Sequence, residues 1–339
     1  MHALSLVVPG LFGPLPDVAE LPAPAALLTL LARAVRRDAV SNDTERLLLH
    51  LFGIAATLEC DAPVASLSWL GEGEGVADGY WLRADPVHLR ADQARLLLFG
   101  SRVLDVQLDE ARTLAAQFNE QFGDDGWRLE TPHPQRWYLR LTGDPLIRTH
   151  ALNEVIGNNI DGFLPHGENG KRWHAILNEV QMLFHSSAVN QTREAQGRLE
   201  INSVWFWGGG PLPAVKAQSW VSVCSDAPLA RGLACAAGVD SESMPDDVMA
   251  WLETAGAGSR LVVLSSLQEP ALYGDVEAWS AAIAELERDW FVPVLNALKS
   301  DRLDQLTLYG GNGQAYAVSR ADLWRFWRRR RALDGYLCS

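Results

Sequence analysis

The sequence predicts an α/β protein with a mainly parallel sheet and an inserted, smaller α+β domain. Apolar segments of strand length alternate with helical segments at the start of the chain and again after Gln196, as in a parallel sheet covered by helices. Between about residues 60 and 141 the chain changes to short β-like segments rich in Trp and Arg. We therefore expect a discontinuous core domain, residues 1–59 and 191–339, and an inserted domain, residues 60–190.

The core domain begins with a buried strand, ALSLVV, which Pro9 and Gly10 terminate. The loop after it lies at a strand's carboxyl end, where open α/β sheets bind ligands. Helices are predicted over 25–37 and 44–52, with Ser41, Asn42 or Asp43 as the second N-cap. Later core elements are strands in INSVWFW, WVSVC, SRLVVLSS and LTLYGG, and helices over 227–236, 246–255 and 276–299, the last kinked by Pro293.

The inserted domain is predicted to contain short strands in SLSWL, YWLRADPVHL, RLLLFG, GWRLE and RWYLRL. The last two flank TPHPQ, whose prolines favour a hairpin-like turn. Helices are expected over 109–122, 146–155 and 171–185. The last places His174, Asn178, Gln181 and His185 on one face. This stripe either lines a cleft, with His185 as a proton carrier or anion contact, or bonds to neighbouring backbone.

The charge of the chain is unevenly distributed. There are 29 Lys and Arg against 42 Asp and Glu, a net charge of −13, which makes nucleic acid an unlikely general partner. Residues 320–331 hold six Arg and one Asp, +5, so the remainder sums to −18. We expect this segment to be a helix with Ser319 as N-cap and Leu323, Phe326 and Trp327 as its docking face. Its arginines could bind a partner's acidic surface, a membrane surface or, the favoured choice, the acidic body of this chain.

Hydropathy and cysteine content predict a cytoplasmic protein. No apolar run approaches the roughly 20 residues of a membrane helix, so we expect no membrane span, and ALSLVV is not preceded by a basic segment as in a signal peptide. The four cysteines, Cys60, Cys224, Cys235 and Cys338, fit neither a disulfide framework nor a C-x-x-C pair. We expect reduced thiols, with Cys224 and Cys235 buried.

The segment 189–210 contains the strongest functional pattern. Asn190 and Arg193 can share a helix face, and an Arg there can hold a carboxylate or phosphate. Three glycines, 208–210, follow a strand and either let backbone N–H groups approach an anion or form a tight turn. Trp205 and Trp207 lie on the same strand face, which favours core or interface packing.

The same segment carries a family resemblance. Val189-Asn190-x-x-Arg193-x-x-x-Gly197-x-x-x-x-Asn202-x-x-x-x-x-Gly208-x-Gly210 resembles the junction of cofactor-independent phosphoglycerate mutases of the archaeal type, in the alkaline phosphatase superfamily. WLRADPVHLRAD, NEVQMLFH and INSVWFWGGG together resemble the bacterial RpfE-type regulatory proteins, over most of the chain. The resemblance implies an alkaline phosphatase-like core with an inserted domain.

The chain departs from the mutase pattern where that family binds two metal ions. The first strand ends in Val8-Pro9-Gly10 instead of a metal-binding Asp, Tyr273 stands where His would fall, and Tyr309 precedes Gly310-Gly311 where an Asp-His pair belongs. All eight His lie at or before position 185, so none can replace these ligands from the C-terminal half. Loss of several ligands should remove two-metal chemistry.

We therefore expect no metal, no other cofactor and no catalytic residue, but a regulatory or ligand-sensing pseudoenzyme whose partner is a small anionic ligand or a protein. Candidate anion-binding residues are Arg83, His88, Arg140, His185, Asn190, Arg193 and Asn202; structural ion pairing with Asp and Glu is the alternative role. The alternative function is a phosphoglycerate mutase or related phosphotransferase with a rearranged site, in which Asp17, Asp226 and Asp275 converge at the strand ends.

Overall fold

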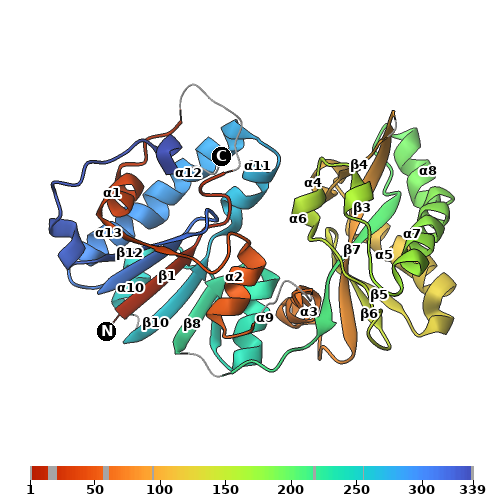
Figure 1. Ribbon diagram of the computed structural model, residues 1–339, viewed down its shortest axis with the longest axis horizontal. Helices are drawn as coiled ribbons and strands as arrows, with labels where there is room; N and C mark the ends of the chain where they lie inside the picture. The colour runs from red at the N-terminus through yellow and green to blue at the C-terminus, as the bar shows by residue number, and fades with distance from the viewer. Residues whose placement is uncertain are drawn as a thin grey trace. The chain divides into compact units, whose positions relative to one another are not determined.

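The computed structural model describes residues 2–13, 21–55, 61–93, 95–216, 219–254 and 256–336. The chain forms two compact units: the core unit, Met1–Ile54 with Val215–Ser339, and the second unit, Ala55–Ala214. Each has its own sheet, mainly parallel in the core unit and antiparallel in the second (Figure 1). The predicted fold class is confirmed.

The core unit is built on a seven-stranded sheet with the order β2-β12-β11-β1-β10-β8-β9. The central strands are parallel, whereas β12 runs antiparallel to both β11 and β2 at one edge. The strands are β1 (His2–Val7), β2 (Val35–Asp38), β8 (Trp220–Ser225), β9 (Asp240–Glu242), β10 (Gly258–Val263), β11 (Gln305–Tyr309) and β12 (Gln314–Ser319).

Helices cover this sheet, with α1, α12 and α13 on one face in Figure 1. The helices are α1 (Ala25–Arg33), α2 (Thr44–Leu51), α9 (Pro228–Ala237), α10 (Val248–Thr254), α11 (Gln268–Leu272), α12 (Val276–Leu286) and α13 (Val292–Lys299). A π-helical turn, Glu287–Phe291, joins α12 to α13 just before Pro293, because proline cannot donate to the α-helical ladder. Helix α1 stops at Arg33, short of the predicted residue 37, because the following residues pair with β12 as β2.

The N-terminus of α1 is capped from another helix. Pro24 at the N-cap offers no side-chain bond. The Glu287 carboxylate instead accepts hydrogen bonds from the backbone N–H groups of Ala26, at 2.6 Å, and Leu27, at 3.1 Å, and its negative charge suits the positive end of the helix dipole.

The second unit contains a five-stranded antiparallel sheet in which β4, β3, β6 and β5 are neighbours and β7 pairs with β3. Its strands are β3 (Tyr80–Asp92), β4 (Arg95–Phe99), β5 (Arg128–His133), β6 (Arg136–Leu141) and β7 (Ser203–Pro211). Its helices are α3 (Val64–Glu72), α4 (Ser101–Leu104), α5 (Leu108–Phe122), α6 (Leu152–Val155), α7 (Gly170–His185) and α8 (Ala188–Ala195).

Several predicted elements differ in the second unit. The strand expected in INSVWFW exists as β7 but pairs antiparallel with β3, so residues 191–214 pack with the second unit rather than with the core. Eight of its nine residues are buried, which gives it the uniformly apolar pattern of a parallel core strand. SLSWL lies in α3, not in a strand, and the helix predicted over 146–155 is limited to α6.

The C-terminal helix prediction is wrong. A 3₁₀ turn, Ala321–Trp324, is followed by irregular backbone and a second 3₁₀ turn, Leu333–Tyr336. Leu323 packs against the core, but Phe326 and Trp327 are exposed and form no docking face. Arg33 donates to the carbonyl groups of Arg325 and Arg328, so contacts with α1 engage the backbone of this segment.

Two further predictions concern membrane spans and thiols. No helix in the described ranges is long and apolar enough to cross a bilayer. Cys224 is buried, but Cys235 is exposed on α9, contrary to expectation. Cys60 and Cys338 lie outside the described residues.

Candidate functional site

The loop after β1 is packed as part of the core. The Val8 N–H donates to the Tyr309 carbonyl at 2.8 Å, and the Trp279 indole N–H donates to the Gly10 carbonyl at 2.8 Å. Gly10 has φ 79°, and a Cβ there would lie 2.5 Å from the Leu267 carbonyl oxygen. The position that holds a metal-binding Asp in the mutase pattern is therefore a tight apolar turn.

The other strand ends at this edge carry few potential metal ligands. Strand β8 ends in Ser225, β10 in Val263 and β11 in Tyr309, and burial raises the pKa of the Tyr309 hydroxyl, which favours the neutral phenol. The Asp275 carboxylate caps α12 by accepting the Ala278 N–H at 3.0 Å. Asp226 directly follows the end of β8 and is exposed, and Asp17 lies outside the described residues.

A two-metal site needs several such ligands converging on each ion. The described residues contain no group of three or more His, Cys, Asp or Glu that could hold a metal ion. The donors present in this part of the chain therefore do not fit the two-metal site that the family resemblance implies.

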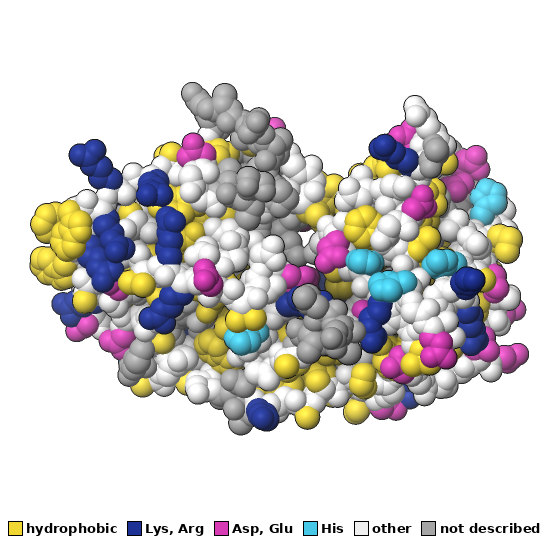
Figure 2. Space-filling view, in the orientation of Figure 1, with side chains coloured by type: hydrophobic (Ala, Val, Ile, Leu, Met, Phe, Trp, Pro, Cys, Tyr) yellow, Lys and Arg dark blue, Asp and Glu magenta, His cyan; other side chains and the backbone are white. Residues whose placement is uncertain are grey.

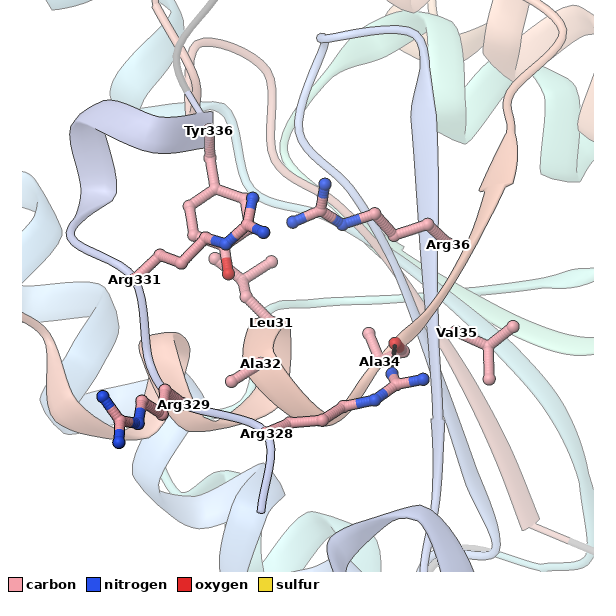
Figure 3. Close-up of a pocket in the computed structure, with 9 residues that line it drawn as sticks. All are labelled: Leu31, Ala32, Ala34, Val35, Arg36, Arg328, Arg329, Arg331 and Tyr336. Carbon is pink, nitrogen blue, oxygen red and sulfur yellow. Dashed lines mark hydrogen bonds between the residues drawn. The ribbon is translucent and has the colours of Figure 1, made fainter. Parts of the chain in front are cut away.

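The core unit instead contains a pocket of about 670 Å³ with a basic lining (Figure 3). We call it the arginine pocket. Its lining residues are Leu31, Ala32, Ala34, Val35, Arg36, Arg328, Arg329, Arg331 and Tyr336. Four of the nine are arginines and none is acidic, so the pocket is suited to an anion.

Local contacts hold the two walls of the arginine pocket together. One wall is the end of α1 and the start of β2; the other is the C-terminal segment. Arg33 donates to the Arg328 carbonyl at 2.7 Å, and Arg328 donates to the Ala34 carbonyl at 2.8 Å. The Asn312 amide donates to the Tyr336 carbonyl at 3.2 Å and to the Tyr316 hydroxyl at 2.9 Å.

The arginines of the pocket are not neutralised within the described part of the chain. The Arg36 guanidinium carbon lies 5.0 Å from the ring centre of Tyr336 and 5.6 Å from that of Tyr316, and none of the four arginines makes an ion pair with a described carboxylate. In Figure 3 the side chains of Arg36 and Arg331 extend toward each other beside Tyr336, whereas Arg329 points away. Ring stacking fixes the Arg36 guanidinium but leaves its N–H groups available at the edge.

Arg36, one residue of the arginine pocket, lies toward the carboxyl-end edge of the sheet, whereas Val35 is level with Thr307 at the middle of β11. Arg36 is in register with Tyr316, and Tyr316 is in register with Leu308, one residue before the end of β11. Phe12, in the loop after β1, lies 5.5 Å from the Tyr316 ring and 6.1 Å from the Tyr336 ring. Ligands of open α/β sheets bind at this edge.

Asn190 and Arg193, predicted to bind an anion, are buried on α8 and bond to the protein itself. The Asn190 amide donates to the carbonyls of Phe184 and Ile201 at 2.8 and 2.9 Å and accepts the Ile201 N–H at 2.8 Å. Arg193 donates to the Leu199 carbonyl at 2.7 Å, to the Glu110 carboxylate at 2.6 Å and to the Leu104 carbonyl. These bonds attach α8 to the segments around it.

Arg83 and Arg140 lie on neighbouring strands and pair with different carboxylates. Buried Arg83 is 2.5 Å from the Asp85 carboxylate, and its guanidinium lies over the rings of Tyr138 and Trp207 at 4.9 and 5.3 Å. The Trp207 indole N–H donates to the other Asp85 oxygen at 2.8 Å. Arg140 makes an exposed pair with Asp78 at 2.7 Å.

His88, His185 and Asn202 lie around one segment. The His88 Nδ1 is 3.0 Å from the Glu200 carbonyl oxygen, and the exposed His185 Nδ1 is 3.8 Å from the Glu200 carboxylate. Asn202 bonds to both backbone groups of Leu89, accepting its N–H at 2.8 Å and donating to its carbonyl at 2.9 Å. The structure thus brings these three residues into one neighbourhood; their binding of an anion stays a prediction.

Sequence reasoning missed the arginine pocket. The run of arginines near the C-terminus was visible, but nothing in it indicated contact with Arg36. The available signal was the pair of adjacent arginines, Arg36 and Arg37, directly after the apolar helix. These arginines lie in the edge strand Val35–Asp38.

Comparison with known proteins finds sequence similarity to phosphoglycerate mutases over part of the chain. No protein family model matches the chain. It is 23% identical over 206 residues to a probable 2,3-bisphosphoglycerate-independent phosphoglycerate mutase of Geobacter sulfurreducens, covering 58% of this chain and 51% of the relative. It is 24% identical over 207 residues to the 2,3-bisphosphoglycerate-independent phosphoglycerate mutase of Methanosarcina acetivorans, with the same coverage.

The chain spans about half the length of these curated relatives. Among solved structures, the PH0037 protein from Pyrococcus horikoshii matches with a TM-score of 0.54 and 12% identity, covering 94% of this chain and 87% of that one. The chain therefore resembles cofactor-independent phosphoglycerate mutases in sequence over part of its length and shares the fold of a solved α/β protein.

Proposed function

We propose that this chain is a non-catalytic, ligand-sensing protein with a phosphoglycerate mutase-like fold, and that its core unit binds a small, multiply charged anion in the arginine pocket. The observation that carries the proposal is the pocket lining, in which four arginines and no carboxylate surround about 670 Å³. The regulatory role and cytoplasmic location expected from the sequence belong to this proposal.

The chemistry of the pocket favours a phosphate ester or a polycarboxylate. Guanidinium groups bind both oxyanions through paired hydrogen bonds, and Arg36 and Arg331 extend toward each other in the pocket (Figure 3). Its volume is in the range of small-molecule sites. Because the four arginines are exposed, we expect binding to weaken as salt is added.

The packing at the strand ends supports a role without two-metal chemistry. Pro9 and Tyr309 stand where the mutase pattern has metal ligands, and Gly10, which follows Pro9, has no room for a side chain. Restoring a single Asp at position 9 would not rebuild the site, because each ion needs several ligands.

The proposal is tested by titrating the full chain with pyrophosphate, citrate, 3-phosphoglycerate and inorganic phosphate while heat unfolding is followed. We expect the multiply charged anions to raise the unfolding temperature. Arg36→Gln and Arg331→Gln should remove this effect, and Arg37→Gln, an exposed neighbour on β2 that does not line the pocket, should retain it. Equal responses of wild type and Arg36→Gln would overturn the pocket assignment.

A second measurement tests the absence of catalysis. Mn²⁺ and Zn²⁺ are titrated into the chain, and mutase and phosphatase turnover are assayed with and without chelator. We expect no stoichiometric metal binding and no turnover. Binding of two ions per chain with chelator-sensitive turnover would overturn the non-catalytic role and favour the rearranged phosphotransferase.

A further inference from the structure

Three large aromatic side chains at the C-terminal end of the core unit are exposed. Trp324, Phe326 and Trp327 are 74%, 76% and 67% exposed; we call them the aromatic tip. Phe326 and Trp327 contact each other edge to face, with ring centres 5.5 Å apart. Figure 2 shows hydrophobic side chains beside a group of basic side chains at the end of the core unit where Figure 1 draws the C-terminal segment in dark blue.

The aromatic tip adjoins unneutralised positive charge. Arg320 pairs with Asp301 at 2.7 Å, and Arg325 pairs with Asp322 at 2.9 Å. The next four arginines, residues 328–331, make no ion pair with a carboxylate in the described ranges. The favoured expectation, that this segment docks on the acidic body of its own chain, is thus supported by the Arg320–Asp301 pair but not by Arg328–Arg331, whose contacts include no carboxylate in the described ranges.

The segment is attached to the fold next to the aromatic tip. Arg33 on α1 donates to the carbonyls of Arg325 and Arg328, and Arg328 donates to the Ala34 carbonyl. Leu323, one residue before the tip, packs against the core. These contacts fix the backbone that carries the aromatic side chains. Folding therefore already covers part of the conformational entropy that would otherwise be lost when the segment binds a partner.

We propose that the aromatic tip and Arg328–Arg331 dock the core unit on an anionic lipid surface. Trp and Phe rings lie favourably at the boundary between headgroups and acyl chains. Arginines near an anionic leaflet add electrostatic attraction to the negatively charged headgroups.

Charge favours a lipid surface over an acidic protein or nucleic acid. Outside residues 320–331 the chain sums to −18, and a polyanion that extends over its surface meets this repulsion. A flat bilayer would contact only the aromatic tip and its arginines. Acidic groups that lie more than a Debye length of about 8 Å from the bilayer would be largely screened from its charge.

The proposal goes beyond the anion-binding function. Arg328, Arg329 and Arg331 belong to both surfaces, but the aromatic tip does not line the arginine pocket and Arg36 lies on β2, outside the docking surface, so variants of the tip and of Arg36 let the two proposals fail separately. The test is flotation of the full chain with vesicles of phosphatidylcholine alone or mixed with phosphatidylglycerol. We expect binding only to the mixed vesicles, and release by high salt.

The decisive variant is Trp324→Ser/Phe326→Ser/Trp327→Ser, which should lower vesicle affinity about tenfold or more while leaving the pyrophosphate response unchanged. Arg36→Gln should abolish the pyrophosphate response and leave vesicle affinity unchanged. Met182→Ser, which removes an exposed apolar side chain of the second unit, serves as the matched control, and unfolding temperatures report folding. No binding of wild type to mixed vesicles at low salt, or equal binding by the triple variant, would overturn the proposal.

Discussion

The Arg36 guanidinium stacks on the ring of Tyr336, with 5.0 Å between the guanidinium carbon and the ring centre. This contact joins an edge strand near the N-terminus to the last described turn of the chain. Since Tyr336 also lies 6.1 Å from Phe12 and is itself buried, the pocket wall is continuous with the core, and its shape depends on the aromatic packing behind it.

Removing the Tyr336 ring should therefore weaken both the fold and the pocket. We expect Tyr336→Ala to lower the free energy of unfolding by about 3 kcal/mol, as for other buried aromatic rings, and to weaken pyrophosphate binding because Arg36 loses its stacking partner. Tyr336→Phe keeps the ring and should retain most of both properties. Denaturant unfolding and calorimetric titration measure the two effects, and tight anion binding by folded Tyr336→Ala would contradict the positioning role.

A substitution at Asn190 tests whether this side chain stabilises the second unit or binds a ligand. Its amide satisfies two carbonyls and one N–H, so Asn190→Ala leaves buried backbone groups without partners and should cost about 2–4 kcal/mol of unfolding free energy. Gln191→Ala, an exposed neighbour on the same helix, should cost little. Denaturant unfolding of the two variants gives the comparison; an Asn190→Ala protein of wild-type stability would argue for a ligand contact instead.

The packing of the loop after β1 can be probed at two glycines with similar backbone angles. Gly10→Ala places a Cβ 2.5 Å from the Leu267 carbonyl oxygen, whereas at Gly311 the nearest neighbours are 3.9 Å away. Both have positive φ, so both substitutions carry about 1 kcal/mol of backbone strain. Heat unfolding should show a clearly larger loss for Gly10→Ala, and equal losses would mean that the turn is not tightly packed.

Acid should destabilise the second unit partly through Glu72. Burial raises the pKa of this carboxyl. The hydrogen bond and positive charge of Arg136, together with a hydrogen bond from the Tyr138 hydroxyl, outweigh burial and hold the pKa below 4.5. A carboxyl with a lowered folded-state pKa stabilises the fold above its unfolded-state pKa, and this contribution is lost as the pH falls through the folded-state value. Unfolding free energies measured from neutral pH down through pH 4 should therefore fall less steeply in Glu72→Gln than in wild type, whereas Glu74→Gln, an exposed neighbour, should follow wild type.

Local patterns predicted much of the fold. The hairpin β5–β6 follows from TPHPQ between two apolar strands, and α7 from its helical spacing, because both depend on neighbours in sequence. Strand β7 was assigned to the wrong sheet, because burial of both faces gives the same pattern whether its partners are parallel or, as with β3, antiparallel.

The site was harder to predict than the fold. The departures at Pro9 and Tyr309 could be identified by position alone, since neither a proline nor a neutral phenol replaces the carboxylate or imidazole ligands of the mutase pattern. The arginine pocket could not, because Arg36 and Arg331 come from opposite ends of the chain and only tertiary packing shows that both line one cavity.

The cap that Glu287 provides to α1 has a consequence for synthesis of the chain on the ribosome. The N-terminal helix gains this cap only after Glu287 has been made, and β1 pairs only with β10 and β11, which follow the whole second unit. The strands of the second unit pair among themselves within Ala55–Ala214, so this unit can complete its sheet first. The arginine pocket needs Arg36 as well as residues 328–336, so a nascent chain cannot bind an anion there before residue 336 has been made.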